Sequence, residues 1–338
     1  MGPGGSPRGT GSERIAIALR AGGLCLVLLV AGCLPATASP RSSPTPTSRT
    51  SPARAQSPTP PPEPQRAEVP LPAARQEVAS AADGRSLYVI GGFDPGRHSS
   101  SSVFILTDAW ATGPSYPLPI DHAAAAVLDG RLYVAGGFSN GAAQGAVYAL
   151  DQGAWHQVAS LHHPRGALAL VGLTRKLYAI GGNAAAGNVA PIEVYDPAAD
   201  AWTDGPDLPS PRNHLAGFNY QGLVCVAGGR SPNTTRVDCL SAARETWSRL
   251  PDLPFATSGA GAGVVGVDDE VVVAGGEDPN ESLLVTQVAR LRGRAWSAEA
   301  MLVPRHGIQL ALFRERLWAC GGATAPAYQA SAACTSFG

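Results

Sequence analysis

The sequence predicts an all-β protein built from six repeats, and three observations lead to this fold class. An apolar run ending in two glycines recurs six times, at steps of 45 to 47 residues. The segments between these runs are short, alternating or apolar, and are bounded by Gly, Asp, Asn or Pro, as short antiparallel strands are. No segment after residue 33 has a sustained helical period. A fixed period of this length indicates repeats that pack on their neighbours. The first glycines of the six pairs are Gly91, Gly136, Gly181, Gly228, Gly275 and Gly321.

Each complete period is expected to hold four strands, a to d. Strand a covers about 212–219 in one repeat, strand b ends in the glycine pair, and strand c is IEVYD at 192–196. Strand d begins at a tryptophan. Four-stranded units at this spacing are the blades of a β-propeller, so six blades are expected. The tryptophans that follow the glycine pairs are Trp110, Trp155, Trp202, Trp247 and Trp296.

The phrases RLYVAGG (131–137) and KLYAIGG (176–182), with their trailing tryptophans, resemble the kelch repeat from about residue 66 to the last residue. This resemblance implies a six-bladed kelch-type β-propeller, and it says little about activity because one fold hosts many functions. The tyrosine before the glycine pair is replaced in three blades, by Cys225, Val272 and Trp318.

The segment just before the first blade is expected to supply the strand d that the last blade lacks. Aligning it with the equivalent segment of a later repeat sets Leu71 on Leu208 and Arg75 on Arg212. The N-terminal strand would then close the ring, which removes a long free strand edge.

The N-terminal segment predicts that the protein is exported from the cytoplasm. Residues 1–32 carry arginines followed by the apolar run AGGLCLVLLVAG, which is too short for a stable membrane span and fits a secretory signal. VAGC resembles a bacterial lipobox, which makes residues 1–32 a lipoprotein signal peptide and Cys33 the lipidated residue; the alternative is an ordinary signal peptide. Residues 33–65 contain 10 Pro, 6 Ser and 5 Thr, which is typical of a disordered linker. The expected location is therefore the bacterial cell envelope, at the cell surface or in the periplasm.

The net charge of the repeats limits the classes of ligand. The cysteine pairs indicate the cellular compartment. Residues 67–338 carry 18 Lys and Arg against 24 Asp and Glu, which disfavours a nucleic-acid ligand. Cys225 and Cys239, like Cys320 and Cys334, are 14 residues apart on neighbouring strands b and c of one blade. An exported protein can oxidise both pairs to disulfides, the alternative being buried thiols.

In kelch-like propellers strand a is innermost, so its first residues are expected around the opening of the central pocket, which we call the mouth. Counting 16, 15 and 14 residues back from each first glycine gives three positions per blade. The resemblance implies that the third position faces the ligand, which selects Glu77, His122 and His214. The fifth blade can be aligned from Gly259 or from Thr257. The repeated arginines have the alternative role of scaffold residues. The candidate ligand-binding residues are Arg75, Glu77, Asp121, His122, Arg165, Arg212, His214, Arg305 and His306.

Two functions follow as hypotheses. The first is a monomeric, membrane-tethered and non-catalytic binding module for a glycan, a peptide or an envelope protein. The second is a sugar mutarotase or epimerase, similar to the exported bacterial kelch mutarotases of sialic acid, in which Glu77 would move protons with His122 or His214. No cofactor and no metal are expected, although His162 and His163 in SLHHPR make a metal a weaker alternative.

Overall fold

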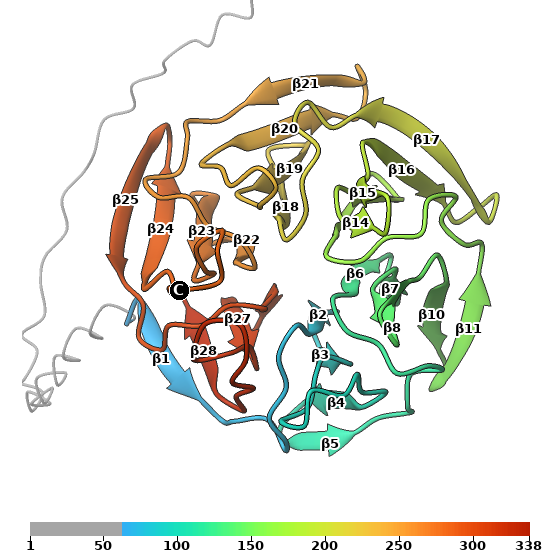
Figure 1. Cartoon of the computed structure of the whole chain (residues 1–338), viewed down its shortest axis with the longest axis horizontal. Helices are drawn as coiled ribbons and strands as arrows, with labels where there is room; N and C mark the ends of the chain where they lie inside the picture. Colours follow the sequence, from blue (N-terminus) through green and yellow to red (C-terminus); the bar gives the residue numbers. More distant parts are fainter. Residues whose placement is uncertain (1–62) are drawn as a thin grey trace, which may run out of the picture. The chain divides into compact units, whose positions relative to one another are not determined.

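The computed structural model describes residues 63–338. The expected signal peptide, Cys33 and most of the linker lie outside the described residues. The described part is all-β and contains six four-stranded antiparallel sheets arranged around one axis, which confirms the six-bladed propeller (Figure 1). No helix within residues 63–338 is long and apolar enough to cross a membrane.

The blades share one strand order from the axis outward. The innermost strands a are β2 (Ala79–Ala82), β6 (Ala124–Leu128), β12 (Ala169–Leu173), β18 (Ala216–Tyr220), β22 (Gly261–Val265) and β26 (Leu310–Phe313). The strands b, which precede the glycine pairs, are β3 (Leu87–Ile90), β7 (Arg131–Ala135), β13 (Lys176–Ile180), β19 (Leu223–Ala227), β23 (Glu270–Ala274) and β27 (Arg316–Cys320).

The outer half of each blade is formed by strands c and d. The strands c are β4 (Val103–Leu106), β10 (Val147–Asp151), β16 (Pro191–Asp196), β20 (Val237–Ser241), β24 (Gln287–Arg292) and β28 (Cys334–Phe337). The strands d are β5 (Trp110–Thr112), β11 (Ala154–Val158), β17 (Ala201–Asp207), β21 (Thr246–Arg249), β25 (Ala295–Ala300) and β1 (Gln65–Glu68). Two short hairpins lie outside the blades: β8 (Phe138–Ser139) with β9 (Ala142–Ala143), and β14 (Asn183–Ala184) with β15 (Gly187–Asn188).

The tryptophan of strand d joins neighbouring blades. The indole Nε1 of Trp202 donates to the carbonyl of Ala159 at 2.8 Å, and that of Trp155 donates to the carbonyl of Pro114 at 2.9 Å. Each acceptor belongs to the connection from the preceding blade. A buried indole needs such a partner because an unpaired polar group away from water costs free energy. Trp110 and Trp296 make the equivalent bond, whereas Nε1 of Trp247 has no hydrogen-bond partner among residues 63–338.

The N-terminal strand closes the ring, as expected. β1 pairs with β28 in antiparallel register, with Gln65 opposite Phe337, and lies at the outer edge of the last blade (Figure 1). Leu71, which follows it, is buried, and its amide donates to the carbonyl of Ala332 at 2.8 Å. Leu208 makes the same bond to Ala190 at 2.9 Å in a later blade, so the alignment of these two leucines is correct.

The expected start of strand a is corrected by four residues. β18 begins at Ala216 and not at Arg212, because His214 has a positive φ of 53° and interrupts the extended backbone.

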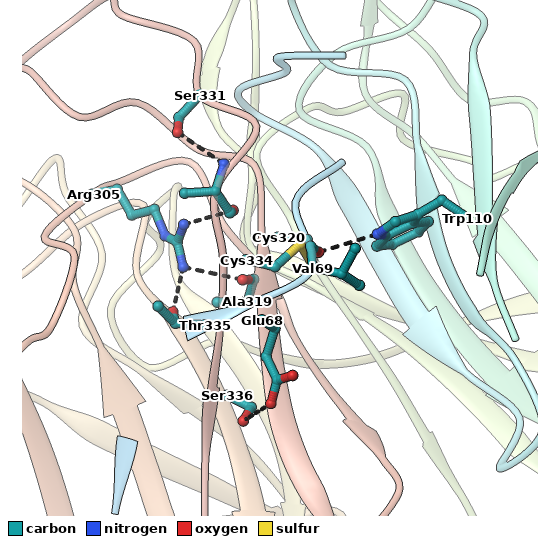
Figure 2. The surroundings of a disulfide bond; sticks show 11 residues. Glu68, Val69, Trp110, Arg305, Ala319, Cys320, Ser331, Cys334, Thr335 and Ser336 are labelled. Atoms are coloured by element: carbon teal, nitrogen blue, oxygen red, sulfur yellow. Dashed lines mark hydrogen bonds between the residues drawn. A yellow bond between two sulfur atoms is a disulfide. The ribbon is translucent and has the colours of Figure 1, made fainter. Parts of the chain in front are cut away.

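Both cysteine pairs form disulfides between strands b and c. One joins Cys225 to Cys239, and the other joins Cys320 to Cys334, which Figure 2 shows. The members of each pair lie directly opposite in the strand register.

Candidate functional site

One residue from each blade, just ahead of strand a, forms a ring around the central axis. All six have a positive φ, and in five of the six steps the amide of one member donates to the carbonyl of the previous member at 2.8 to 3.0 Å. The amide of Val78 closes the circle on the carbonyl of Gly307 at 3.4 Å. The fifth blade contributes Gly259, so the alignment that starts at Thr257 is correct. We call these residues the axial ring: Glu77, His122, Ala167, His214, Gly259 and Gly307.

A small cavity lies on the axis, lined by the axial ring and by the innermost strands. Its volume is about 120 Å³. Gln309 reaches across it from the sixth blade: its Oε1 accepts from the amide of Ser80 at 2.9 Å, and its Nε2 donates to the carbonyl of Ala123 at 3.0 Å. These bonds connect the sixth blade to the first and second blades and reduce the open space along the axis.

Glu77 and His122 form the charged centre of the axial ring. Nε2 of His122 lies 3.4 Å from Oε2 of Glu77, and Nδ1 lies 2.6 Å from Oδ1 of Asp121. Burial would lower the pKa of His122, but Glu77 and Asp121 outweigh it and raise that pKa above its usual value. Burial would likewise raise the pKa of Glu77, but His122 and His306 hold it well below its usual range. Each group of the pair thus favours the charged form of the other.

His306 lies behind the axial ring and not on the exposed mouth, which corrects its assignment as a ligand contact. Its side chain is 2% exposed and sits between two carboxylates, with Nδ1 3.2 Å from Oε1 of Glu77 and Nε2 3.5 Å from Oε2 of Glu277. Neither contact has hydrogen-bond geometry. A Cβ on Gly307 would approach Oε1 of Glu77 to 2.5 Å, so glycine is needed beside this carboxylate. Asp121 is also buried, so it would affect a ligand at the mouth indirectly, through its contact with Nδ1 of His122.

His214 is held as a neutral imidazole. Arg230 donates from Nη2 to Nε2 of His214 at 2.9 Å, so the proton of the ring is on Nδ1, which lies 2.5 Å from Oδ1 of Asn213. Burial, together with the charges of His122 and Arg230, places the pKa of His214 well below its usual value. Arg230 also pairs with Glu277 at 3.1 Å and with Glu281 at 2.5 Å.

Arg230, Glu277 and two phenylalanines at the mouth are absent from the expected site. Each directly follows a glycine pair, and its backbone bridges to the residue just ahead of the axial ring: Phe93 to Gln76, Phe138 to Asp121, Arg230 to Asn213, and Glu277 to Ser258. The position after the glycine pair is the sequence signal that would have found them.

These aromatic side chains surround the imidazole of His122. The ring centroid of His122 lies 5.7 Å from that of Phe93 and 5.6 Å from that of Phe138, both in edge-on geometry. Tyr328 lies 5.5 Å from Phe93, and Arg97 stacks on Tyr328 at 4.2 Å. Phe93, Phe138 and Tyr328 are all partly exposed. The mouth therefore combines apolar ring faces with charged groups.

The arginines Arg165, Arg212 and Arg305 are buried within their blades and not at the mouth, which favours the scaffold role that the sequence left open for them. All three are 0% exposed. Their guanidinium groups bond strands b and c of their own blade. Figure 2 shows this for Arg305, which donates to the carbonyl of Ala319 at 3.0 Å and to Oγ1 of Thr335. Burial lowers the pKa of Arg305 to about 10, which leaves it charged at neutral pH.

Arg75 occupies the same place in the first blade and is also directed away from the mouth. Its Nε donates to Oγ of Ser102 at 3.0 Å, and its guanidinium lies 5.5 Å from the ring of Phe104. Its Nη1 donates to the carbonyl of Ala74 at 2.7 Å, so its hydrogen bonds are made within the first blade.

His162 and His163 are directed at the third blade. Nδ1 of His162 lies 3.3 Å from Oδ1 of Asp204, and Nε2 of His163 lies 3.4 Å from Oδ2 of the same carboxylate. Within residues 63–338, two groups of side chains place possible metal ligands within 4.8 Å of one another: Glu77 with His122 and His214, and His162 with Glu193 and Asp204.

Comparisons with known proteins agree with the propeller fold. Residues 121–162 and 164–209 match the family described as "Kelch motif". No curated protein sequence matches the chain. Among solved structures, the one described as "Structure of YjhT" is similar in fold, with a TM-score of 0.66 and 18% sequence identity; the match covers 79% of this chain and 95% of that chain.

Proposed function

Because the chain is a kelch-repeat β-propeller of six blades, we propose that it is a binding module whose working surface is the mouth around the axial ring. The supporting observation is the convergence there of Glu77, His122 and His214 from three blades, beside partly exposed aromatic side chains. Convergent polar groups in a concave site are the usual mark of a binding site.

The small axial cavity bears on how a ligand would sit. Its volume of about 120 Å³ is below the several hundred Å³ of ordinary small-molecule pockets. A sugar-sized ligand would therefore lie across the mouth, over the axial ring, and would not enter the channel. Such a ligand can contact blades on both sides of the axis.

The chemistry of the mouth favours a hydroxyl-rich glycan. The imidazole of His122 lies beside the carboxylate of Glu77, and the guanidinium of Arg230 pairs with Glu277 and Glu281, so donors and acceptors alternate. Alternating donors and acceptors suit hydroxyl groups, which both donate and accept. The electron-rich faces of aromatic rings suit the C–H face of a sugar ring.

The purified chain should be screened on a glycan array, and hits should be measured by isothermal titration. We expect the His122→Ala/His214→Ala variant to bind about tenfold or more weakly, since a charge-assisted hydrogen bond contributes roughly 1.5 to 3 kcal/mol. His162→Ala/His163→Ala is the matched control, because it removes two histidines that contact the third blade. Unchanged affinity in the first variant would place the ligand elsewhere, and capture of peptides alone would reject the glycan.

A second candidate function is favoured by the carboxylate of Glu77, which lies between the imidazoles of His122 at 3.4 Å and His306 at 3.2 Å. An acid and a base held together away from water can move protons, as opening and closing a sugar ring requires. Anomer exchange of an acidic sugar such as sialic acid, measured by NMR with and without the protein, distinguishes the two functions. Faster exchange that is lost in Glu77→Gln would establish a mutarotase.

The proposed setting is the outside of a bacterial cytoplasmic membrane. A lipid on Cys33 and the Pro, Ser and Thr-rich segment that follows would tether the propeller while leaving its mouth accessible. The two disulfides support an oxidising compartment.

A further inference from the structure

We propose that Glu77, His122 and His214 form a site for a divalent first-row transition metal. Two imidazoles and one carboxylate are the protein ligands of many open zinc sites, in which the fourth position is left to water or to a ligand. No histidine lies at metal-ligand spacing to the cysteines along the sequence, so spacing alone does not indicate this site. The three groups come from three different blades of the ring.

The separations suit one ion. Possible ligand atoms of the three side chains all lie within 4.8 Å of one another. Nε2 of His122 and Oε2 of Glu77 are 3.4 Å apart. Bonds of about 2.0 to 2.1 Å at tetrahedral angles put neighbouring ligand atoms about 3.3 Å apart, so this pair already has the spacing of two metal ligands.

The second observation is how each imidazole is oriented. Nδ1 of His122 faces Oδ1 of Asp121 at 2.6 Å, and Nδ1 of His214 faces Oδ1 of Asn213 at 2.5 Å. Histidines that bind metals commonly donate their second N–H to a carboxylate or carbonyl oxygen, which sets the tautomer and turns the other nitrogen toward the ion. Here the same arrangement occurs in two blades, and it makes Nε2 the metal-binding atom of both rings.

Arg230 now donates to Nε2 of His214. It would keep its other partners if it gave up this hydrogen bond to a metal. It pairs with Glu277 at 3.1 Å and with Glu281 at 2.5 Å, and both contacts remain when the metal takes the imidazole lone pair. The other members of the axial ring are alanine and glycine. Their small side chains leave room for water or a ligand hydroxyl on the open coordination position.

Zinc binding tests this site directly and independently of any glycan. The parent for the test carries His162→Ala and His163→Ala, which remove the histidines beside Asp204 and so prevent zinc binding there. After dialysis against EDTA, titration calorimetry should show one bound Zn²⁺. Cobalt(II) should give a visible absorption band typical of four or five nitrogen and oxygen ligands.

In this parent, Asp121→Asn should weaken zinc binding by about 10 to 100-fold, as the loss of an outer partner of a ligating histidine does. His122→Ala and His214→Ala should each lose at least as much and abolish the cobalt band, and Arg230→Met should tighten binding. His122→Gln keeps a polar side chain beside Asp121 and serves if His122→Ala does not fold. Absence of saturable zinc binding in the parent, or equal affinity in folded His122→Gln, would overturn the proposal.

Discussion

Replacing Arg165 with methionine tests whether the repeated arginines stabilise the blades or bind a ligand. The guanidinium is 0% exposed; it contacts Oε1 of Glu193 at 2.7 Å and donates to the carbonyls of Pro191 at 2.9 Å and Gly181 at 3.2 Å. Methionine fills much of the same volume without the charge. Glu193, also 0% exposed, would then be a buried carboxylate without a counter-ion.

Removing one partner of a buried ion pair costs about 3 to 5 kcal/mol of unfolding free energy. Glu193 still accepts from the amides of His162 at 2.6 Å and His163 at 3.2 Å, so the lower part of that range is expected. With about 2 to 4 °C lost per kcal/mol in a large domain, the melting temperature should fall by about 6 to 12 °C. Arg175→Met is the matched control, since that side chain is 85% exposed and its substitution should change stability little.

Thermal unfolding followed by circular dichroism measures both variants, and ligand titration below the transition measures binding. Adding Glu193→Gln to Arg165→Met should recover part of the loss, because no buried charge remains and the amide oxygen still accepts from one of the two backbone N–H groups. A variant that melts like wild type but no longer binds ligand would refute the scaffold role. A double variant no more stable than the single one would refute the explanation by an unpaired charge.

Three further predictions concern closure, oxidation and anchoring. Leu71→Ala and Leu253→Ala, both 4% exposed, should each cost about 2 to 5 kcal/mol in urea unfolding, and a harmless Leu71→Ala would mean that the N-terminal strand is not part of the cooperative fold. Replacing Cys320 and Cys334 with alanine should cost roughly 3 kcal/mol by the loop-entropy relation, measured against the oxidised parent, whereas unchanged stability would contradict a structural role of this bridge. Fatty-acid labelling of cells should be lost in Cys33→Ala, and labelling that persists would exclude a lipid on that residue.

Much of the fold was predictable because it depends on local rules that recur in the sequence. Glycine pairs end strand b, since glycine adopts a positive φ without strain and leaves room for a neighbouring carbonyl: Gly91 has a φ of 64°, and a Cβ on it would approach the carbonyl oxygen of Ile120 to 2.5 Å. The period of the pairs gives the number of blades, and Leu71 repeats the role of Leu208. The disulfides follow from cysteines on adjacent strands of one blade. Each of these features needs only the residues of one repeat or the comparison of two repeats.

The candidate site was predictable only in part, because the direction of a side chain depends on what packs around it. The sequence by itself determined the six blades, the closing N-terminal segment, and the axial positions of Glu77, His122 and His214. Only the tertiary structure decided that Arg212 is covered by strands b and c of its own blade, while Arg230 reaches the mouth. Both are arginines near a turn, and the difference arises because backbone bridging sets Arg230 beside Asn213, whereas Arg212 must satisfy the buried carboxylate of Asp238.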